Sequence, residues 1–121
     1  LPADVPRAVA IHQMAQVAAI VAACAAGDLA LLGRAMEDRL AEPARAPLLP
    51  GFVEAKRAAL DAGALGAGIS GAGPTMFALV DGDAAGERVA AAVTAAYASL
   101  GIACSARVAM VDEQGARVEV A

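Results

Sequence analysis

The chain has 121 residues, of which 60% are hydrophobic and 2% aromatic, and its formal net charge is −4 at pH 7. This length fits one domain, and so apolar a composition excludes an intrinsically disordered chain. The nine Lys and Arg residues are scattered along the chain, which argues against a nucleic-acid-binding protein, because such proteins need a basic patch to neutralise phosphates.

The first third of the chain predicts two helices. Residues 1–6 contain two prolines and are expected to be extended. Residues 7–26 carry apolar side chains at helical spacing and are followed by Gly27, a typical end signal. Asp28 is expected to cap a second helix over residues 29–40. No apolar run free of charge or glycine reaches the roughly 18–20 residues of a membrane span, so no membrane partner is expected.

The middle of the chain changes its pattern. Three prolines in residues 41–52 are expected to exclude a helix interior there, and residues 53–63 predict a third helix that ends in glycine. Residues 67–73 and 74–80 predict two β segments that are joined at the glycines.

The last third of the chain predicts one more helix and one or two strands. Residues 81–101 predict a fourth helix. Residues 102–111 alternate between apolar and polar side chains, as a half-buried strand does, and residues 115–121 allow a last short strand. Cys24 and Cys104 match no metal or redox spacing, so both are expected to be buried thiols in a reducing, cytoplasmic compartment.

This order of elements predicts an α+β domain over residues 1–121, with an antiparallel sheet and helices packed on one face. Two strands, a helix and a strand resemble a ferredoxin-like fold that lacks its first strand. The first residue is Leu1, not Met, and no signal sequence precedes the first helix. We therefore expect a piece of a longer protein, with the missing strand before Leu1.

The glycine loop is the first candidate site and comprises Ser70, Gly71, Ala72, Gly73 and Pro74. Glycines allow unusual backbone torsions and close approach, and successive bare amides can form a concavity for phosphate or carboxylate oxygens. The alternative is a tight connection between strands that binds no ligand.

Arg45 is the second candidate, because its place between prolines restrains its backbone. Such a guanidinium suits bidentate binding of a carboxylate or phosphate, although it can also be a solvated loop residue. Gln13 and Gln16 could hydrogen-bond a ligand, whereas His12 lacks an orienting partner and is expected to be structural. The acidic residues predict helix caps and solvated charges, and no metal site is expected.

The stretch "GISGAGPTMFALV", Gly68–Val80, resembles the third conserved motif of the GHMP kinases. Within that superfamily the chain is similar to the homoserine kinases in "LPADVP", "GDLALLGRAMEDRL", "EPARAPLLPGF", "AALDAGALGAGISGAGPT" and the terminal "GAR". These stretches occur in the family's order and cover the chain from Leu1 to about Arg117. The resemblance implies transfer of the ATP γ-phosphoryl group, with Mg²⁺, to the side-chain hydroxyl of L-homoserine. The product, O-phospho-L-homoserine, belongs to threonine biosynthesis.

The resemblance also implies that this chain is the C-terminal domain and that an N-terminal domain binds ATP and Mg²⁺. It places the glycine loop at the interdomain cleft and Arg45 on the homoserine carboxylate. Where many relatives have Asp, Asn and Arg, this chain has Val9, Gln13 and Gln16, and Gln16 is the candidate to replace the second substrate arginine. No catalytic residue is expected in this domain, which alone should be inactive.

Two alternatives remain from the residues alone. The first is a non-catalytic, ferredoxin-like regulatory module that binds an amino acid. The second is a subunit that serves dimerisation, since its Ala- and Leu-rich helices favour contact with another surface. A homodimer is compatible with each.

Overall fold

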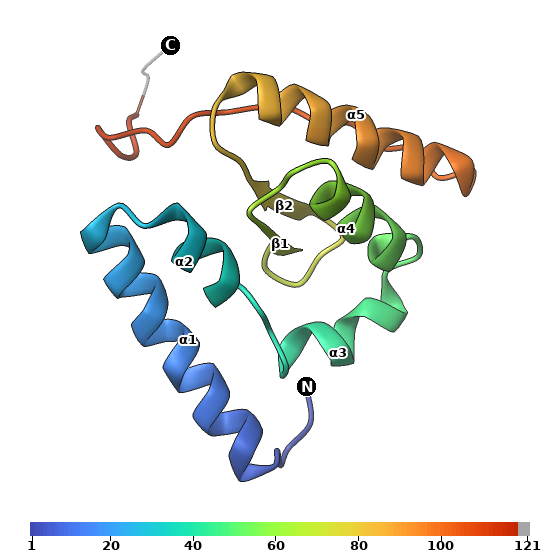
Figure 1. Cartoon of the computed structure of the whole chain (residues 1–121). Coiled ribbons are helices and arrows are strands. Elements are labelled where there is room, and N and C mark those ends of the chain that lie inside the picture. The colour runs from blue at the N-terminus through green and yellow to red at the C-terminus, as the bar shows by residue number, and fades with distance from the viewer. Residues whose placement is uncertain (119–121) are drawn as a thin grey trace.

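The computed structural model describes residues 1–118, which form helices around a small sheet (Figure 1). The helices α1 and α2 make a hairpin at one end of the molecule, and α4 and α5 pack together at the other, with the sheet between them. The elements are α1 (Arg7–Ala26), α2 (Leu29–Ala35), α3 (Ala41–Arg45), η1 (Ala46–Leu48, a 3₁₀ turn), α4 (Phe52–Asp61), β1 (Gly66–Ile69), β2 (Met76–Leu79) and α5 (Asp83–Ser99).

The α1–α2 hairpin follows the predicted signals at its start but not at its end. Helix α1 has the expected bounds and ends at Gly27 in the left-handed conformation, and Asp28 caps α2 by accepting the Leu31 amide at 2.8 Å. Helix α2 stops at Ala35, whereas the prediction ran to residue 40. The reason lies in Asp38, whose carboxylate accepts the amides of residues 40–42 and so begins a new helix.

The proline-rich segment is helical, which corrects the expectation for residues 41–52. Pro43 lies in the first turn of α3, where its missing N–H would have no acceptor within the helix. Pro47 occupies an early position of η1 for the same reason. The segment is therefore a pair of short turns that leads directly into α4.

The sheet consists of β1 and β2, paired antiparallel with Gly66 opposite Leu79 and Ile69 opposite Met76. Helices α4 and α5 pack on one face as predicted, around the buried cluster of Ala59, Ala67 and Val89. Helix α2 approaches the other face, where a Cβ on Gly66 would lie 2.6 Å from Met36 Sδ. Small residues thus let helices contact both faces of a two-stranded sheet.

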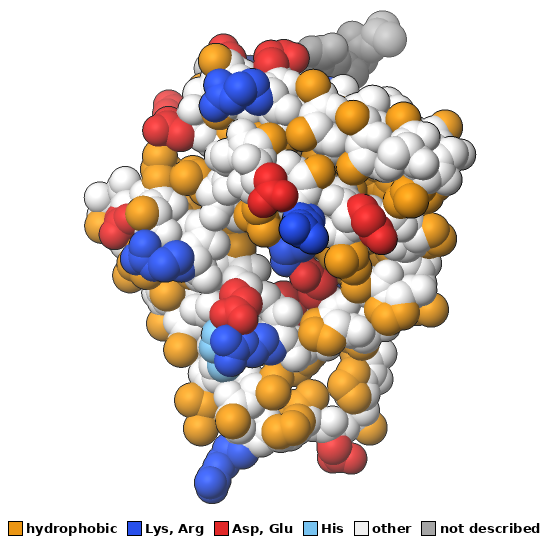
Figure 2. Space-filling view, turned by 45° about the vertical axis from the view of Figure 1, so that its right-hand side comes forward, with side chains coloured by type: hydrophobic (Ala, Val, Ile, Leu, Met, Phe, Trp, Pro, Cys, Tyr) orange, Lys and Arg blue, Asp and Glu red, His pale blue; other side chains and the backbone are white. Residues whose placement is uncertain are grey.

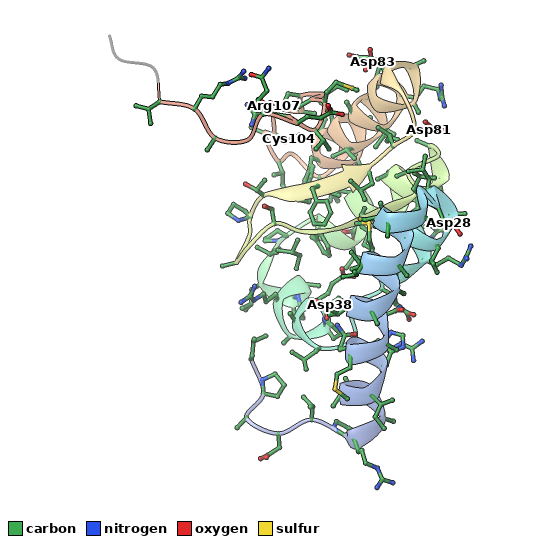
Figure 3. The ribbon with its side chains drawn as sticks, turned by 90° about the vertical axis from the view of Figure 1, so that its left-hand side faces the viewer. Asp28, Asp38, Asp81, Asp83, Cys104 and Arg107 are labelled. Atoms are coloured by element: carbon green, nitrogen blue, oxygen red, sulfur yellow. The ribbon has the colours of Figure 1, made fainter. Side chains whose placement is uncertain are left out.

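The strand predicted over residues 102–111 does not form. This segment runs beside α5, where Figure 3 labels Cys104 and Arg107, and Val108 packs against α5 at Gly86. Within residues 1–118 no backbone hydrogen bond joins it to the sheet. A strand needs a neighbouring strand for its amides and carbonyls, and the described residues place none there. Residues 115–118 are likewise not a strand, and the rest of that predicted element lies outside the described residues.

One further expectation is corrected. Cys24 and Cys104 are both exposed, since Cys24 lies on the outer side of α1 and Cys104 lies on the unpaired segment. Helix α1 passes a test of length and composition for a membrane span, with a mean hydropathy of 1.7 over an 18-residue window, a test that core helices of soluble proteins also pass. The polar side chains of α1, His12 and two glutamines, face α2 and the chain that follows it.

Candidate functional site

The glycine loop closes on itself by two backbone hydrogen bonds. The Ser70 amide donates to the Thr75 carbonyl at 2.8 Å, and the Gly73 amide donates to the Ser70 carbonyl at 3.0 Å. The amides of Gly71 and Ala72 have no protein acceptor within residues 1–118, and both residues are exposed. Of the amides in the described loop, these two adjacent ones are therefore free to bind the oxygen of a ligand.

Arg45 lies against this loop. It is the last residue of α3, and its guanidinium Nη1 donates to the carbonyl oxygen of Gly71, 26 positions further along the chain. The other guanidinium N–H groups have no hydrogen-bonding or acidic partner in the described part of the chain. The predicted clamp and the predicted loop thus share one location, with donors from both left free.

Gly73 is held in a position that no other residue fits. Its φ is +82°, in the left-handed region. A Cβ there would lie 2.8 Å from Leu49 Cδ1, 2.9 Å from Leu49 Cδ2 and 3.5 Å from Ile69 Cγ2. The need for glycine at this end of the loop is therefore both conformational and steric.

Two acidic residues place α3, and with it Arg45. Asp38 caps the first turn, and Figure 3 shows it between α1 and α3. Glu42 accepts from Lys56 Nζ at 2.6 and 2.7 Å, which ties α3 to α4. The side chains of Glu42 and Lys56 are 19% and 21% exposed. Sequence reasoning treated Asp38 as one cap among several and missed Glu42 and Lys56. Asp38 lies three positions before the start of α3, whose first turn contains Pro43. An acidic residue at this spacing is the signal that could have revealed the helix.

Gln13 and Gln16 contact the scaffold rather than Arg45. Gln13 accepts the Arg39 amide at 3.1 Å and donates to Asp38 Oδ1 at 3.4 Å. Gln16 donates to the carbonyl of Arg34 at 3.3 Å. The structure therefore brings Arg45 together with the loop, while Gln16 contacts α2 and Gln13 contacts the connection between α2 and α3.

His12 is packed in the same region, beside Glu37. Its Nε2 lies 3.5 Å from Glu37 Oε2, is buried and has no hydrogen-bond partner. Figure 2 shows this single histidine, in pale blue, among acidic and basic side chains. Hydrogen bonds from the Arg39 guanidinium hold the pKa of Glu37 below its ordinary value, with smaller contributions from nearby positive charges.

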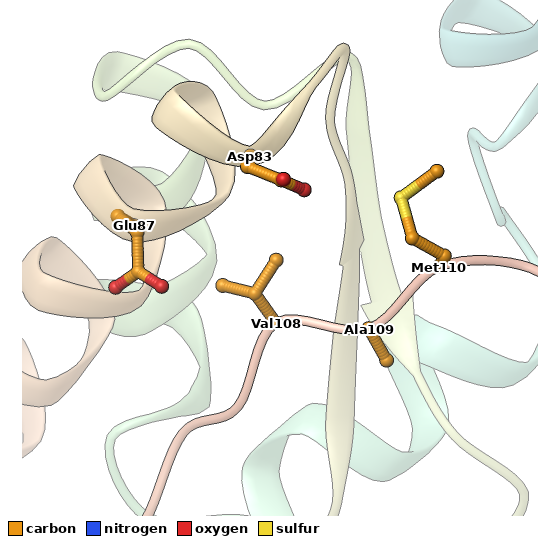
Figure 4. A pocket seen from close by; sticks show the side chains of 5 residues that line it. All are labelled: Asp83, Glu87, Val108, Ala109 and Met110. Carbon is orange, nitrogen blue, oxygen red and sulfur yellow. The ribbon is translucent and has the colours of Figure 1, made fainter.

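A hollow lies at the start of α5, away from the glycine loop. It has a volume of about 290 Å³ and is lined by Asp83, Glu87 and the segment Val108–Met110 (Figure 4). It offers two carboxylates and no third ligand. Within the part of the chain that the structure describes, no group of three or more His, Cys, Asp or Glu side chains is placed to hold a metal ion.

The family model described as "GHMP kinases C terminal" matches residues 20–99, from the middle of α1 to the end of α5. The chain belongs to the GHMP kinase family. The match includes the glycine loop, Arg45 and the contact between them. The family resemblance expected from the loop and the proline segment is thus confirmed.

The relatives it matches include homoserine kinases from distant organisms. The chain is 42% identical over 120 residues to homoserine kinase of Chlorobaculum tepidum, a match that covers 98% of this chain and 37% of that protein. For homoserine kinase of Arabidopsis thaliana the identity is 41%, over 98% of this chain and 32% of that protein.

A solved structure agrees. The crystal structure of homoserine kinase from Cytophaga hutchinsonii superposes with a TM-score of 0.84 and 41% identity, over 85% of this chain and 33% of that one. The predicted α+β class is confirmed, with a small antiparallel sheet and the GHMP kinase C-terminal fold. The chain spans about a third of the length of the relatives it matches.

Proposed function

We propose that this chain is the substrate-side domain of an ATP-dependent homoserine kinase. The reaction transfers the γ-phosphoryl group of ATP to the side-chain hydroxyl of L-homoserine and yields O-phospho-L-homoserine. The observation that carries the proposal is the contact between Arg45 and the glycine loop, in a GHMP kinase domain whose relatives at 41–42% identity are homoserine kinases.

Phosphoryl transfer depends on positioning and charge neutralisation more than on covalent chemistry by the protein. Arg45 has free guanidinium donors that suit the carboxylate of the amino-acid substrate. The free amides of Gly71 and Ala72 suit an oxygen of the substrate or of a phosphate. Gln16 and Gln13 are proposed as further substrate contacts, for which the Gln16 amide would exchange its hydrogen bond to Arg34 for one to the ligand.

Nucleotide and metal are assigned to another domain. The described residues do not fit an Mg²⁺ site, because Mg²⁺ requires several oxygen ligands in octahedral geometry and no cluster of three such side chains exists among them. We propose that an N-terminal domain of the same polypeptide binds ATP and Mg²⁺, and that this domain alone has no kinase activity. The exposed thiols Cys24 and Cys104 fit a reducing cytoplasm. That the full-length protein forms a homodimer remains a prediction.

The test is an assay of the full-length protein with ATP and a panel of hydroxylated amino acids. We expect ADP release that depends on homoserine, with the phosphorylated product identified by phosphorus NMR. A full-length protein that binds homoserine in calorimetry but releases no ADP with any acceptor would instead indicate the amino-acid-binding regulatory module.

A further inference from the structure

Leu49 lies against the end of the glycine loop, at the point where the chain leaves η1 and turns into α4. Its two methyl groups occupy the space beside the α-carbon of Gly73, where a Cβ would come within 2.8 and 2.9 Å of them. We infer that Leu49 is a positioning residue, which fixes the glycine loop and so sets where the free amides of Gly71 and Ala72 point. The kinetic part of this inference rests on the proposed function.

The backbone of Leu49 is held on both sides. Its amide donates to the Ala46 carbonyl at 3.1 Å, and its carbonyl accepts the Phe52 amide at 3.1 Å. Phe52 is 1% exposed and anchors the start of α4 in the core. The side chain of Leu49 therefore projects from a fixed origin, and its position against the loop is set by the core rather than by the loop.

Leu49 and Arg45 hold the loop at different points. Arg45 binds the carbonyl of Gly71, and Leu49 packs against Gly73, so Ala72 lies between two restrained residues. A ligand-binding amide that is oriented before the ligand arrives needs no reorganisation during the reaction. Without the Leu49 methyl groups the loop keeps its two backbone hydrogen bonds and its contact with Arg45, but it loses the side-chain packing at Gly73 that helps to fix the direction of the free amides.

The neighbouring leucine provides a matched control. Leu48 has the same side chain, lies one position earlier in the same turn and is 76% exposed. Truncation of Leu48 removes the same atoms from the same segment without loss of a buried contact. A difference between the two positions therefore reports the contact with the loop and not the composition of the segment.

The first experiment compares Leu49→Ala, Leu49→Met and Leu48→Ala in the full-length enzyme, assayed with ATP and homoserine. Leu49→Ala should lower kcat by about 10–100-fold, as expected for a misplaced active-site group, with smaller changes in both KM values. Leu49→Met should recover most of the loss, because it conserves volume. Leu48→Ala should match wild type. Equal kcat in the Leu49→Ala and Leu48→Ala enzymes overturns the inference.

A size exchange with Gly73 tests the same contact if Leu49→Ala is poorly stable. Gly73→Ala should inactivate the enzyme, because its methyl group meets the Leu49 side chain. Shortening Leu49 in the same protein should restore part of the activity, and only part, since alanine disfavours a φ of +82°. If the activity of the double variant is lowered by the product of the two single fold-losses or by more, the effects are independent. That result contradicts direct packing of Leu49 against residue 73.

Hydrogen exchange separates this inference from the proposed function. The amides of Ser70 and Gly73 are hydrogen-bonded within the loop, and both should exchange faster in the Leu49→Ala protein than in the Leu48→Ala protein. This readout needs no turnover. If the wild-type enzyme phosphorylates nothing, the proposed function fails while faster exchange still supports the role of Leu49. If wild type is active and Leu49→Ala changes neither exchange nor kcat, the inference alone fails.

Discussion

The guanidinium of Arg45 donates a hydrogen bond to the carbonyl oxygen of Gly71, which joins the end of α3 to the turn between β1 and β2. The contact uses one of the five N–H groups of arginine and leaves the rest for a ligand. Arg45 can therefore restrain the loop and bind a carboxylate at the same time.

Arg45→Ala in the full-length enzyme should raise the KM for homoserine by about 10–100-fold, the usual effect of losing a hydrogen-bonded charge. The KM for ATP should change little, because the nucleotide is proposed to bind elsewhere. Steady-state kinetics with each substrate varied in turn would measure both. Arg57→Ala is the control, since that side chain is 84% exposed on α4. An unaltered KM for homoserine removes Arg45 from the proposed clamp.

Gly73→Val should abolish activity, because the added carbons collide with Leu49 and valine is strained at a φ of +82°. Gly71→Ala is the informative comparison. Its φ is +60°, but a Cβ there meets nothing within 4 Å, so it is subject to the conformational strain without the collision. We expect reduced but measurable turnover for Gly71→Ala. Wild-type turnover of Gly73→Val would refute the close approach.

Glu42→Gln should destabilise the protein by about 1–3 kcal/mol, because it leaves the Lys56 ammonium largely buried without its carboxylate. Thermal unfolding would measure the loss. Asp61→Asn provides the contrast, since its pairing with Arg57 at 3.7 Å is exposed and should contribute about 0–1 kcal/mol. Similar losses in both variants would mean that the tie between α3 and α4 adds nothing specific.

The outer edge of β2 should be covered in the full-length protein. By the alternation of the antiparallel ladder, the amides of Met76 and Ala78 point away from β1. Within residues 1–118 neither these amides nor residues 102–111 pair with a strand. A ferredoxin-like sheet that lacks its first strand would leave the same groups unpaired. We expect slow hydrogen exchange at Met76, Ala78 and alternate residues of 102–111 in the full-length protein, and fast exchange in the domain alone. Fast exchange in both would contradict the missing strand.

Stability should decline at acidic pH through Glu37. Its pKa is lowered below the ordinary value of 4.5 in the folded state, mainly by the hydrogen bonds from Arg39. The folded protein therefore binds this proton less readily than the unfolded chain, so the stabilisation is present above the unfolded pKa and is lost as pH falls through the folded pKa. Unfolding midpoints of wild type and Glu37→Gln should converge at low pH. Arg39→Ala should remove the same pH dependence. A difference between the unfolding midpoints of wild type and Glu37→Gln that stays constant across pH would contradict the role of Glu37.

Local sequence signals determined the main helices, the glycine turn and the family. Spacing of apolar residues, the Asp28 cap and terminal glycines act within a few positions of the chain, so residues 7–26 were predicted to the residue. The prediction for the proline segment was wrong because it treated proline only as a helix breaker. The free-energy cost of proline in a helix depends on its position relative to the cap. Here the Asp38 side chain decides where α3 begins and so places Pro43 in the tolerant first turn.

The tertiary structure alone decided which residues meet. The predicted strand at 102–111 has the right alternation but no partner, since strand pairing is a long-range interaction that alternation cannot supply. Arg45 and the glycine loop were each recognisable from composition, but their contact spans 26 positions and depends on how α3 is tied to α4. Leu48 and Leu49 carry the same side chain and are neighbours in the sequence. Only the path of the chain into the buried Phe52 turns one leucine to solvent and the other onto Gly73, because side-chain direction is set by the packed backbone.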